Sequence, residues 1–452
     1  MTSRIALRGI ALTVASVSAL GGATAVAAPG PPTEVLVRFA DGATPAQRGS
    51  AHAAVGLAGR VADSIPALGV EVVQLPPGRS AAEAAAAYER QPGVRSAGPN
   101  GELHALAFPD GTTAPNDPYF ALYQWNLRGI GAVAAWGRAT GLRLNGTRAK
   151  VAVVDTGVAF ENNGSTYKIA PDLADSSYVK FDAAHDYDYI NNDSHANDDN
   201  GHGTHVTGTI AGTTNNGLGV SGLAFKVQVL PIKVLSKSGS GSYSAVAKGI
   251  LRAAGYNVAG SATEFPPVDV INLSLGGPND TSGVVDAALQ KAQDRNVVIV
   301  AAAGNDGTGS AGYPASADVA RPTGSSYTFR VIGVGATGYF DAGNAPYRAP
   351  YSNYGPGVDV YAPGGDTSKD LDKNGYGDGI LQQTFSRNPS SFGYYFFQGT
   401  SMAAPHVAGL AALLRAQNPT WTPSQVESKI ISTGSLTTLG ANLINADAAT
   451  AP

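Results

Sequence analysis

Three residue types that together activate a nucleophile each stand beside a glycine-rich turn in this sequence. Asp155 ends the apolar run KVAVVD, His202 lies in GHGTHVTGT, and Ser401 opens SMAAPHVAGLAALL. A serine nucleophile needs a base to take its proton, and the base needs a carboxylate that fixes its tautomer and stabilises its charged form. Taken alone, the aspartate and the serine are also typical of turns and helix caps. Together the three residues indicate acyl-transfer chemistry.

A second histidine close by, His205, raises the alternative of a metal site. On a helix, His202 and His205 would share one face, so both rings could bind one ion. Zinc needs at least a third protein ligand, and the sequence has no cysteine and only 7 histidines. The spacing also differs from H-E-x-x-H, in which the histidines stand a full turn apart. These observations argue against a metal site formed by this pair.

Ser401 is expected at the start of a helix, because glycine and small residues precede an apolar run. The backbone N–H groups and the dipole of a helix N-terminus favour developing negative charge there. Pro405 is compatible with this helix, since it lies close to its start. The run AAAGND offers Asn305, at the end of another apolar run, as a side-chain donor to an oxyanion.

A sheet that gathers strand ends at one edge would position these residues. Apolar, β-branched runs bounded by glycine occur at 150–157, 227–235, 268–277, 296–305 and 330–336. Such runs are typical of strands buried on both faces of a parallel sheet. Helix-compatible segments lie between or after them, at 242–257, 282–295 and 401–417. The alternation predicts an α/β fold with helices on both faces of the sheet, which binds ligands beyond the carboxyl ends of its strands.

The start of the chain has a different character. Residues 1–28 resemble a secretory signal, with Arg4 and Arg8 before an apolar stretch and small residues at a cleavage site. A short α+β unit follows, with strands expected at 34–40, 69–76 and 94–100 and helices at 44–56 and 80–91. Residues 108–118 are a turn-rich linker.

The bulk composition limits the classes of partner and the sources of stability. A net charge of -4 argues against nucleic acid or an anionic membrane as the natural partner. An extracellular protein without cysteine has no disulfides, so it depends on core burial and often on bound ions.

The blocks VVDTG, GHGTHVTGT, INLSLGG, AAAGN and GTSMAAPHVAG resemble the signature segments of the subtilisin-like serine proteases, or subtilases. The resemblance extends over roughly 119–447 and implies a three-layer subtilisin-like fold with a mostly parallel central sheet. It implies that Asp155 orients the base, that His202 is the general base and that Ser401 is the nucleophile. Asn305 and the Ser401 N–H would form the oxyanion hole, and His205 would have a structural role.

The resemblance also implies where a peptide substrate binds. Two strand edges, Gly239-Ser240-Gly241 and Ser274-Leu275-Gly276, would pair with extended substrate backbone, which glycine lets approach closely. The first specificity pocket would be lined by small residues, namely Ala302, Ala303, Gly304 and Gly312. Small walls admit a sizeable apolar side chain, and Asp306 nearby also suits a basic one. Broad specificity with a preference for sizeable P1 side chains is therefore expected.

Three oxygen-rich segments are candidates for structural calcium. The loop 213–222 resembles the tight calcium loop of the family, with ligands from Asp172, Asn216, Leu218 and Val220. The segment 188–202 resembles a second loop, with Asp188, Asn191, Asp193 and Asn197 at its ligand positions, although His195 departs from that pattern. The segment DLDKNGYGDGIL, 370–381, starts like an EF-hand, but Leu381 stands where the bidentate glutamate belongs. A plain Asp/Gly turn is the favoured interpretation of this third segment.

The N-terminal unit resembles the propeptide of the same enzymes, a folding assistant and intramolecular inhibitor. The expected organisation is a signal peptide at 1–28, a ferredoxin-like α+β propeptide at 29–107, a linker at 108–118 and a peptidase domain at 119–452. The maturation cut is expected between Leu103 and Asp117. The sequence thus predicts a secreted, extracellular, monomeric serine endopeptidase, stabilised by one or two calcium ions, that acts on polypeptides and processes itself.

Two rival functions remain at this stage. One is a catalytically silent binding or scaffold protein of the same fold, which the intact candidate residues disfavour. The other is a processing protease or peptide ligase with a narrow substrate.

Overall fold

The computed structural model describes residues 5–6, 33–40, 42–66, 69–100, 114–259, 262–319, 327–341, 343–435 and 437–452. Within them the chain forms two compact units, one from 11–105 and one from 1–10 together with 106–452. Apart from β1 (Ile5–Ala6), the predicted signal peptide lies outside the described residues, as does most of the predicted maturation segment, at 101–113. No helix in the described ranges is long and apolar enough to cross a membrane.

The smaller unit has a ferredoxin-like order of elements. It runs β2 (Glu34–Phe39), α1 (Pro45–Ala54), β3 (Val61–Ile65), β4 (Val70–Gln74), α2 (Ala81–Glu89) and β5 (Val94–Pro99). The strands form one antiparallel sheet in the order β3-β4-β2-β5. Strand β3 is the element that the sequence pattern missed, because all five of its residues are exposed and no apolar alternation marks it.

The larger unit is built on a parallel sheet with the strand order β16-β13-β12-β11-β10-β6-β9-β7, and β8 also pairs with β9. Its strands are β6 (Lys150–Asp155), β7 (Lys180–Phe181), β8 (Tyr187–Asp188), β9 (Gln228–Lys233), β10 (Val270–Leu273), β11 (Val298–Ala302), β12 (Ile332–Thr337), β13 (Val360–Pro363) and β16 (Asn442–Leu443). All five strands expected in this region are present and almost fully buried, which confirms the predicted mostly parallel sheet.

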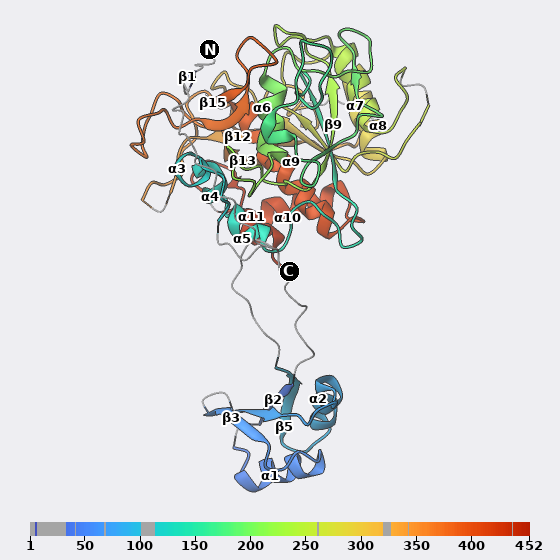
Figure 1. The fold of residues 1–452 in the computed structure, drawn as a ribbon. Coiled ribbons are helices and arrows are strands. Elements are labelled where there is room, and N and C mark those ends of the chain that lie inside the picture. The colour runs from blue at the N-terminus through green and yellow to red at the C-terminus, as the bar shows by residue number, and fades with distance from the viewer. Residues whose placement is uncertain are drawn as a thin grey trace. The chain divides into compact units, whose positions relative to one another are not determined.

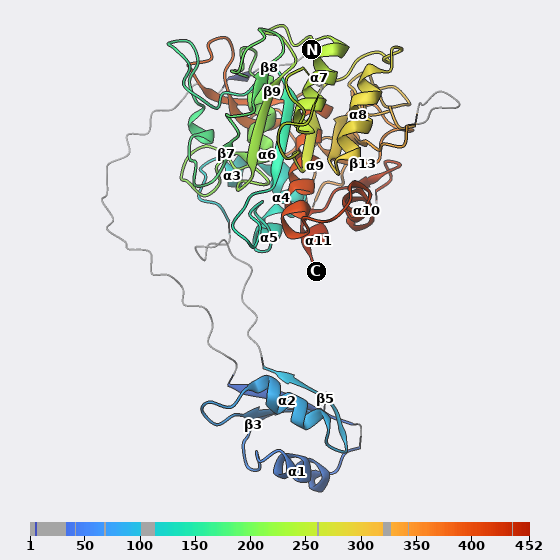
Figure 2. The same cartoon turned by 90° about the vertical axis from the view of Figure 1, so that its right-hand side faces the viewer.

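Helices cover both faces of this sheet (Figure 1; Figure 2). The side chains of β6 alternate between two hydrophobic cores, one on each face of the sheet. Val151 and Val153 pack with α6 (His202–Ala211) and α9 (Thr400–Gln417). Ala152 and Val154 pack with α7 (Tyr243–Ala253) and α8 (Val284–Asp294) on the other face. The three layers follow from this alternation. The remaining helices, which the sequence pattern did not predict, are α3 (Phe120–Tyr123), α4 (Trp125–Gly129), α5 (Ala132–Trp136), the 3-10 turn Pro171–Leu173, α10 (Pro423–Thr433) and α11 (Ala446–Thr450).

A separate antiparallel sheet precedes the Ser401 helix. It consists of β14 (Ile380–Thr384) and β15 (Gly393–Phe397), with β1 paired to β15. Strand β14 packs against α6, and the Thr384 hydroxyl donates a 2.6 Å hydrogen bond to the Gly201 carbonyl at the start of that helix. The hairpin therefore supports the segment that carries His202.

Candidate active site

Asp155 and His202 meet where β6 ends and α6 begins. Asp155 is fully buried at the carboxyl end of β6, and its Oδ1 lies 2.7 Å from Nδ1 of His202. The same oxygen accepts a 2.7 Å hydrogen bond from the Thr156 N–H. A carboxylate at this distance fixes the imidazole tautomer with a proton on Nδ1, so that Nε2 is the unprotonated nitrogen, which can act as a base. Gly203 allows the start of α6 to lie close to the turn after β6, because a Cβ at this position would lie 2.1 Å from the Gly157 carbonyl oxygen.

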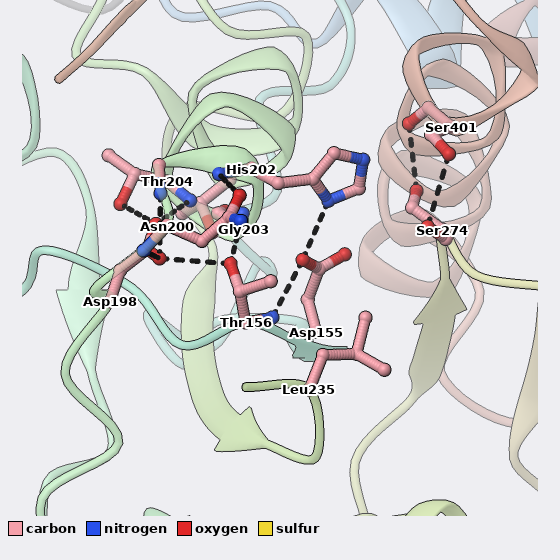
Figure 3. A network of polar contacts seen from close by, with 12 residues as sticks. Asp155, Thr156, Asp198, Asn200, His202, Gly203, Thr204, Leu235, Ser274 and Ser401 are labelled. Carbon is pink, nitrogen blue, oxygen red and sulfur yellow. Dashed lines mark hydrogen bonds and ion pairs between the residues drawn. The ribbon is translucent and has the colours of Figure 1, made fainter. Parts of the chain in front are cut away.

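A second buried carboxylate, Asp198, organises the first turn of α6. Its two oxygens accept hydrogen bonds from three backbone N–H groups and two hydroxyls, those of Thr156, Asn200, Gly201 and Thr204 (Figure 3). The Thr156 hydroxyl in turn accepts from the Gly203 N–H at 2.9 Å. Asp198 thereby ties the turn after Asp155 to the helix that carries His202. Sequence reasoning did not single out Asp198, since it stands in a run of similar polar residues, NDDN.

Lys233, at the end of β9, supports the same turn from the other side. Its side chain is almost fully buried, and Nζ donates to the carbonyl oxygens of Thr156 and Leu235 and to the Asp199 carboxylate, at 2.6 to 2.9 Å. A buried ammonium is stable only when all its donors are satisfied in this way. The turn that follows Asp155 is therefore held by two buried charges from different elements.

Ser401 lies in the first turn of α9, opposite His202. The His202 ring points toward the side of the site that carries Ser401 (Figure 3), and both residues line one cleft of about 710 Å³. The Ser401 hydroxyl donates to the Ser274 carbonyl at 3.1 Å, and the Ser274 hydroxyl donates to the Ser401 carbonyl at 2.8 Å. This pair of bonds connects the end of β10 to the start of α9.

Asn305 follows β11 and is tied to the same helix. Its Oδ1 accepts hydrogen bonds from the backbone N–H and the hydroxyl of Thr400, at 2.9 and 3.0 Å. Because Oδ1 is engaged, the amide nitrogen is the group that Asn305 can offer to a ligand. Asn353 steadies the segment after Asn305, since its Oδ1 accepts from the N–H groups of Asp306 and Thr308.

The cleft contains both strand edges that the sequence indicated. Gly239, Ser240 and Gly241 line it on one side, and Ser274, Leu275 and Gly276 on the other. Apolar lining residues that the sequence analysis missed include Tyr243, Val246, Val285 and Tyr313. These four come from α7, α8 and a loop, so no local pattern connects them. The four small residues expected in the first specificity pocket, Ala302, Ala303, Gly304 and Gly312, are not among those lining this cleft. Their role stays a prediction.

His205 is fully buried and does not line the cleft. Its ring stacks on Phe397 at 4.3 Å between centroids, and Nε2 lies 3.0 and 3.1 Å from the carbonyl oxygens of Ile380 and Tyr395. Burial lowers the pKa of His205 to about 3, so the ring is neutral and donates from Nε2. Its contacts join α6 to the β14–β15 hairpin.

Two buried carboxylates from other segments lie against the loop expected to bind calcium, 213–222. Asp172 is 2 % exposed, and Oδ2 accepts from the Val220 N–H at 3.0 Å while the Asn216 side-chain amide donates to Oδ1 at 3.4 Å. Asp117, which the sequence analysis assigned to the linker, lies at the same loop and accepts from the Asn215 N–H at 2.6 Å. Among the described residues, its Oδ1 has no hydrogen-bond partner. Burial raises the pKa of Asp117 to about 6 and that of Asp172 to about 8.

These two carboxylates fit a hard cation. Two buried, convergent carboxylates are unfavourable unless a positive charge compensates them, and oxygen is the ligand atom that calcium prefers. In the second expected loop, by contrast, both oxygens of Asp188 accept hydrogen bonds from Ile190 and Asn191 of the loop itself, and Asp193 accepts from the His195 N–H. Asn197 donates to Glu161, and its own Oδ1 is unpartnered within the described ranges.

Comparison with known proteins defines the class to which this site belongs. Residues 146–447 match the Subtilase family, and residues 31–100 match the Fervidolysin N-terminal prodomain. Subtilisin Savinase from Lederbergia lenta is 37 % identical over 330 residues, which cover 72 % of this chain and 98 % of that protein. Thermitase from Thermoactinomyces vulgaris is 37 % identical over 303 residues, 67 % of this chain and 86 % of that protein.

Two further relatives extend the comparison. An extracellular protease from Xanthomonas campestris is 34 % identical over 463 aligned positions, covering 95 % of this chain and 70 % of that protein. A solved structure of a protease from Pseudoalteromonas arctica is 34 % identical, covers 75 % of this chain and 98 % of that chain, and has a TM-score of 0.59. The chain therefore belongs to the subtilase family. It is a serine endopeptidase of subtilisin-like fold with an N-terminal prodomain, as the sequence motifs predicted.

Proposed function

We propose that this chain is a secreted endopeptidase of broad specificity in which Asp155, His202 and Ser401 form the catalytic triad. The observation that carries the proposal is the 2.7 Å contact between Asp155 Oδ1 and His202 Nδ1 in a cleft that Ser401 also lines. Without substrate, the Ser401 hydroxyl donates to the Ser274 carbonyl. Rotation about its Cα–Cβ bond directs it toward Nε2 of His202 when substrate binds, since catalytic hydrogen bonds often form only in the complex.

The reaction then has two acyl-transfer steps. Ser401 Oγ attacks the scissile carbonyl carbon while His202 Nε2 takes the hydroxyl proton, and Asp155 stabilises the resulting imidazolium. The oxyanion accepts hydrogen bonds from the Asn305 side-chain amide and the Ser401 N–H. His202 gives its proton to the leaving amine, which departs and leaves an ester on Ser401. A water molecule, deprotonated by His202, hydrolyses that ester and restores the enzyme.

Substrate binds as an extended strand between residues 239–241 and 274–276. Both edges line the cleft, and glycine at positions 239, 241 and 276 leaves the backbone accessible for pairing. Gly241 has no space for a side chain, because a Cβ would lie 2.0 Å from the Val234 carbonyl oxygen. Main-chain hydrogen bonds depend little on the side chains of the substrate, which supports broad specificity. A preference for sizeable P1 side chains rests on the expected pocket at 302–304 and 312.

Replacement of the nucleophile tests the assignment. We expect Ser401→Ala to leave the prodomain attached and to abolish cleavage of casein, because no acyl-enzyme can form. The measurements are mass spectrometry of the purified chain and release of labelled peptides. A serine-directed fluorophosphonate should label the wild type and not Ser401→Ala or His202→Ala. Complete processing in Ser401→Ala would contradict the triad, whereas labelling with turnover of only one peptide from a library would favour a narrow processing enzyme.

We also propose that calcium binds at the Asp172 loop and stabilises the fold. Asp117, Asp172 and Asn216, with the Leu218 and Val220 carbonyls, would hold it, and the bound ion would offset the repulsion of the buried carboxylates. A chelator is expected to lower the thermal midpoint by about 5 °C or more, from the linkage of binding to folding. The shift should shrink in Asp172→Asn. An unchanged midpoint after chelation would contradict this site. The second loop, at 188–197, stays a weaker expectation.

The prodomain is proposed to act as an intramolecular inhibitor until the maturation bond is cut. The proposal is supported by the prodomain match over 31–100 and by the compact fold of that unit. The signal-like pattern of residues 1–28 and the extracellular relative from Xanthomonas campestris support secretion.

A further inference from the structure

The loop between β13 and β14 carries a cluster of three carboxylates outside the cleft. Asp370, Asp372 and Asp378 each place an oxygen within 4.8 Å of the other two. Two oxygens bound to one calcium ion at 2.3–2.6 Å lie at most about 5 Å apart, so a single ion can contact all three. Lys369, which precedes the cluster, is directed to Asp366, at 4.0 Å.

Asp378 is the most buried carboxylate of the cluster. It is 2 % exposed, and Oδ2 accepts a 2.8 Å hydrogen bond from the Leu371 N–H. In the part of the chain that the structure describes, Oδ1 has no hydrogen-bond partner. A buried carboxylate oxygen is rarely left unpaired, so this one calls for a donor or a cation.

The loop also has the residue spacing of an EF-hand. Gly375, with φ 87°, makes the sharp turn at the sixth position. Oxygen ligands stand at the first, third, fifth, seventh and ninth positions, as Asp370, Asp372, Asn374, the Tyr376 carbonyl and Asp378. Leu381, at the twelfth position, is fully buried and offers no ligand. The sequence alone favoured a plain turn for this reason, whereas the fold brings Asp378 into the cluster as a third carboxylate.

We propose that Asp370, Asp372 and Asp378 bind a calcium ion, with Asn374 and the Tyr376 carbonyl as further oxygen ligands. The chemistry points to a hard divalent cation, because the cluster offers only oxygen. This site is separate from the Asp172 loop and does not depend on the triad.

The ion would brace the hairpin behind the catalytic helix. The loop leads directly into β14, whose first residue, Ile380, receives the hydrogen bond from His205 of α6. Next to it, the Gly379 carbonyl accepts from Trp125 Nε1 at 3.2 Å. Within the loop, the Tyr376 ring stacks on Phe396 of β15 at 5.6 Å between centroids. A cation that fixes the loop therefore fixes both strands of the hairpin.

Calcium stoichiometry in the full-length chain tests the proposal. Metal-stripped Ser401→Ala protein, chosen to prevent self-digestion, is compared with versions that also carry Asp378→Asn or Asp370→Asn. Equilibrium dialysis should show one calcium fewer per chain for Asp378→Asn. Asp370→Asn, at an exposed position that spares the fold, should weaken one site at least tenfold. Terbium emission excited through Tyr376 should fall in both variants.

The controls separate this site from the others. Asp341→Asn, at an exposed turn whose carboxylate also accepts backbone N–H groups, should keep full stoichiometry. Asp172→Asn together with Asp378→Asn should remove one more equivalent than Asp378→Asn alone. Unchanged stoichiometry and affinity in both Asp370→Asn and Asp378→Asn would overturn the proposal. Because the assay measures binding only, failure of the triad assignment would leave this result intact.

Discussion

The candidate catalytic residues differ in how firmly the structure holds them. The His202 ring is fixed by Asp155, which is itself held by the Thr156 N–H. Asn305 is fixed through Oδ1 by two donors of Thr400, so its amide nitrogen has a defined direction. Ser401, in contrast, has a hydroxyl that must turn from the Ser274 carbonyl to the base. On the proposed roles, the base and the oxyanion donor are preorganised, and the nucleophile is the residue that substrate binding would align.

Removal of the oxyanion donor should affect the chemical step and not the binding of substrate. We expect Asn305→Ala to lower kcat by about 10²–10³-fold with little change in KM, because the lost hydrogen bond forms only as charge develops on the carbonyl oxygen. Steady-state kinetics on a soluble peptide substrate measures both constants. Thr400→Val is the matched variant: it loses the hydroxyl that orients Asn305 but keeps the backbone donor, so a smaller loss is expected. A KM effect without a kcat effect would contradict this role for Asn305.

Between elements, the site depends on the junction of β6, β9 and α6. Asp198 joins the turn after β6 to the first turn of α6, while Lys233 of β9 holds the same turn through the Thr156 carbonyl. Neither Asp198 nor Lys233 lines the cleft. Their contribution is positional, because they set the distance between Asp155 and His202.

Loss of the Asp198 carboxylate should therefore reduce both stability and turnover. In Asp198→Ala, several buried donors lose their acceptor, at about 1–3 kcal/mol each where water cannot replace it. We expect the free energy of unfolding to fall by at least about 2 kcal/mol and kcat per active molecule to fall as well. Denaturant unfolding of the Ser401→Ala background and fluorophosphonate active-site titration separate the two effects. Asp294→Asn, at an exposed position at the end of α8, should change neither. Normal kcat in the folded fraction of Asp198→Ala would show a purely structural role.

The parts of the fold that the sequence predicted share one property, which is a strong local signal. Strands β6, β9, β10, β11 and β12 are buried on both faces, so their β-branched runs are visible without the structure. Strands β3 and β16 are short or exposed at sheet edges and lack such a run. The motifs identified Asp155, His202 and Ser401, but the acceptor role of Asp198 depends on contacts with Thr156, 42 positions earlier in the chain. Composition alone could not distinguish Asp198 from its neighbours.

At the scale of the whole molecule, the proposed maturation requires a cut that leaves the peptidase unit intact. The segment just before α3 is built into that unit, because Asn116 exchanges hydrogen bonds with the loop at 215–217 and Asp117 accepts from the Asn215 N–H. Asp117 is 3 % exposed and lies beside Asp172. A cut after Asp117 would remove a buried carboxylate from the proposed calcium loop.

We therefore expect the mature N-terminus to fall between residues 103 and 116, with Asn116 and Asp117 retained. Intact-mass measurement and N-terminal sequencing of the processed enzyme locate it, and Ser401→Ala provides the unprocessed reference. Asp117→Ala should be processed at the same bond but should lose part of the calcium-dependent rise in thermal midpoint, because only the ligand has changed. Lys180→Ala, at an exposed position of β7, is the matched control and should keep the full rise. A mature chain that starts at Pro118 or later and still gains stability from calcium would show that the Asp172 loop binds its ion without Asp117.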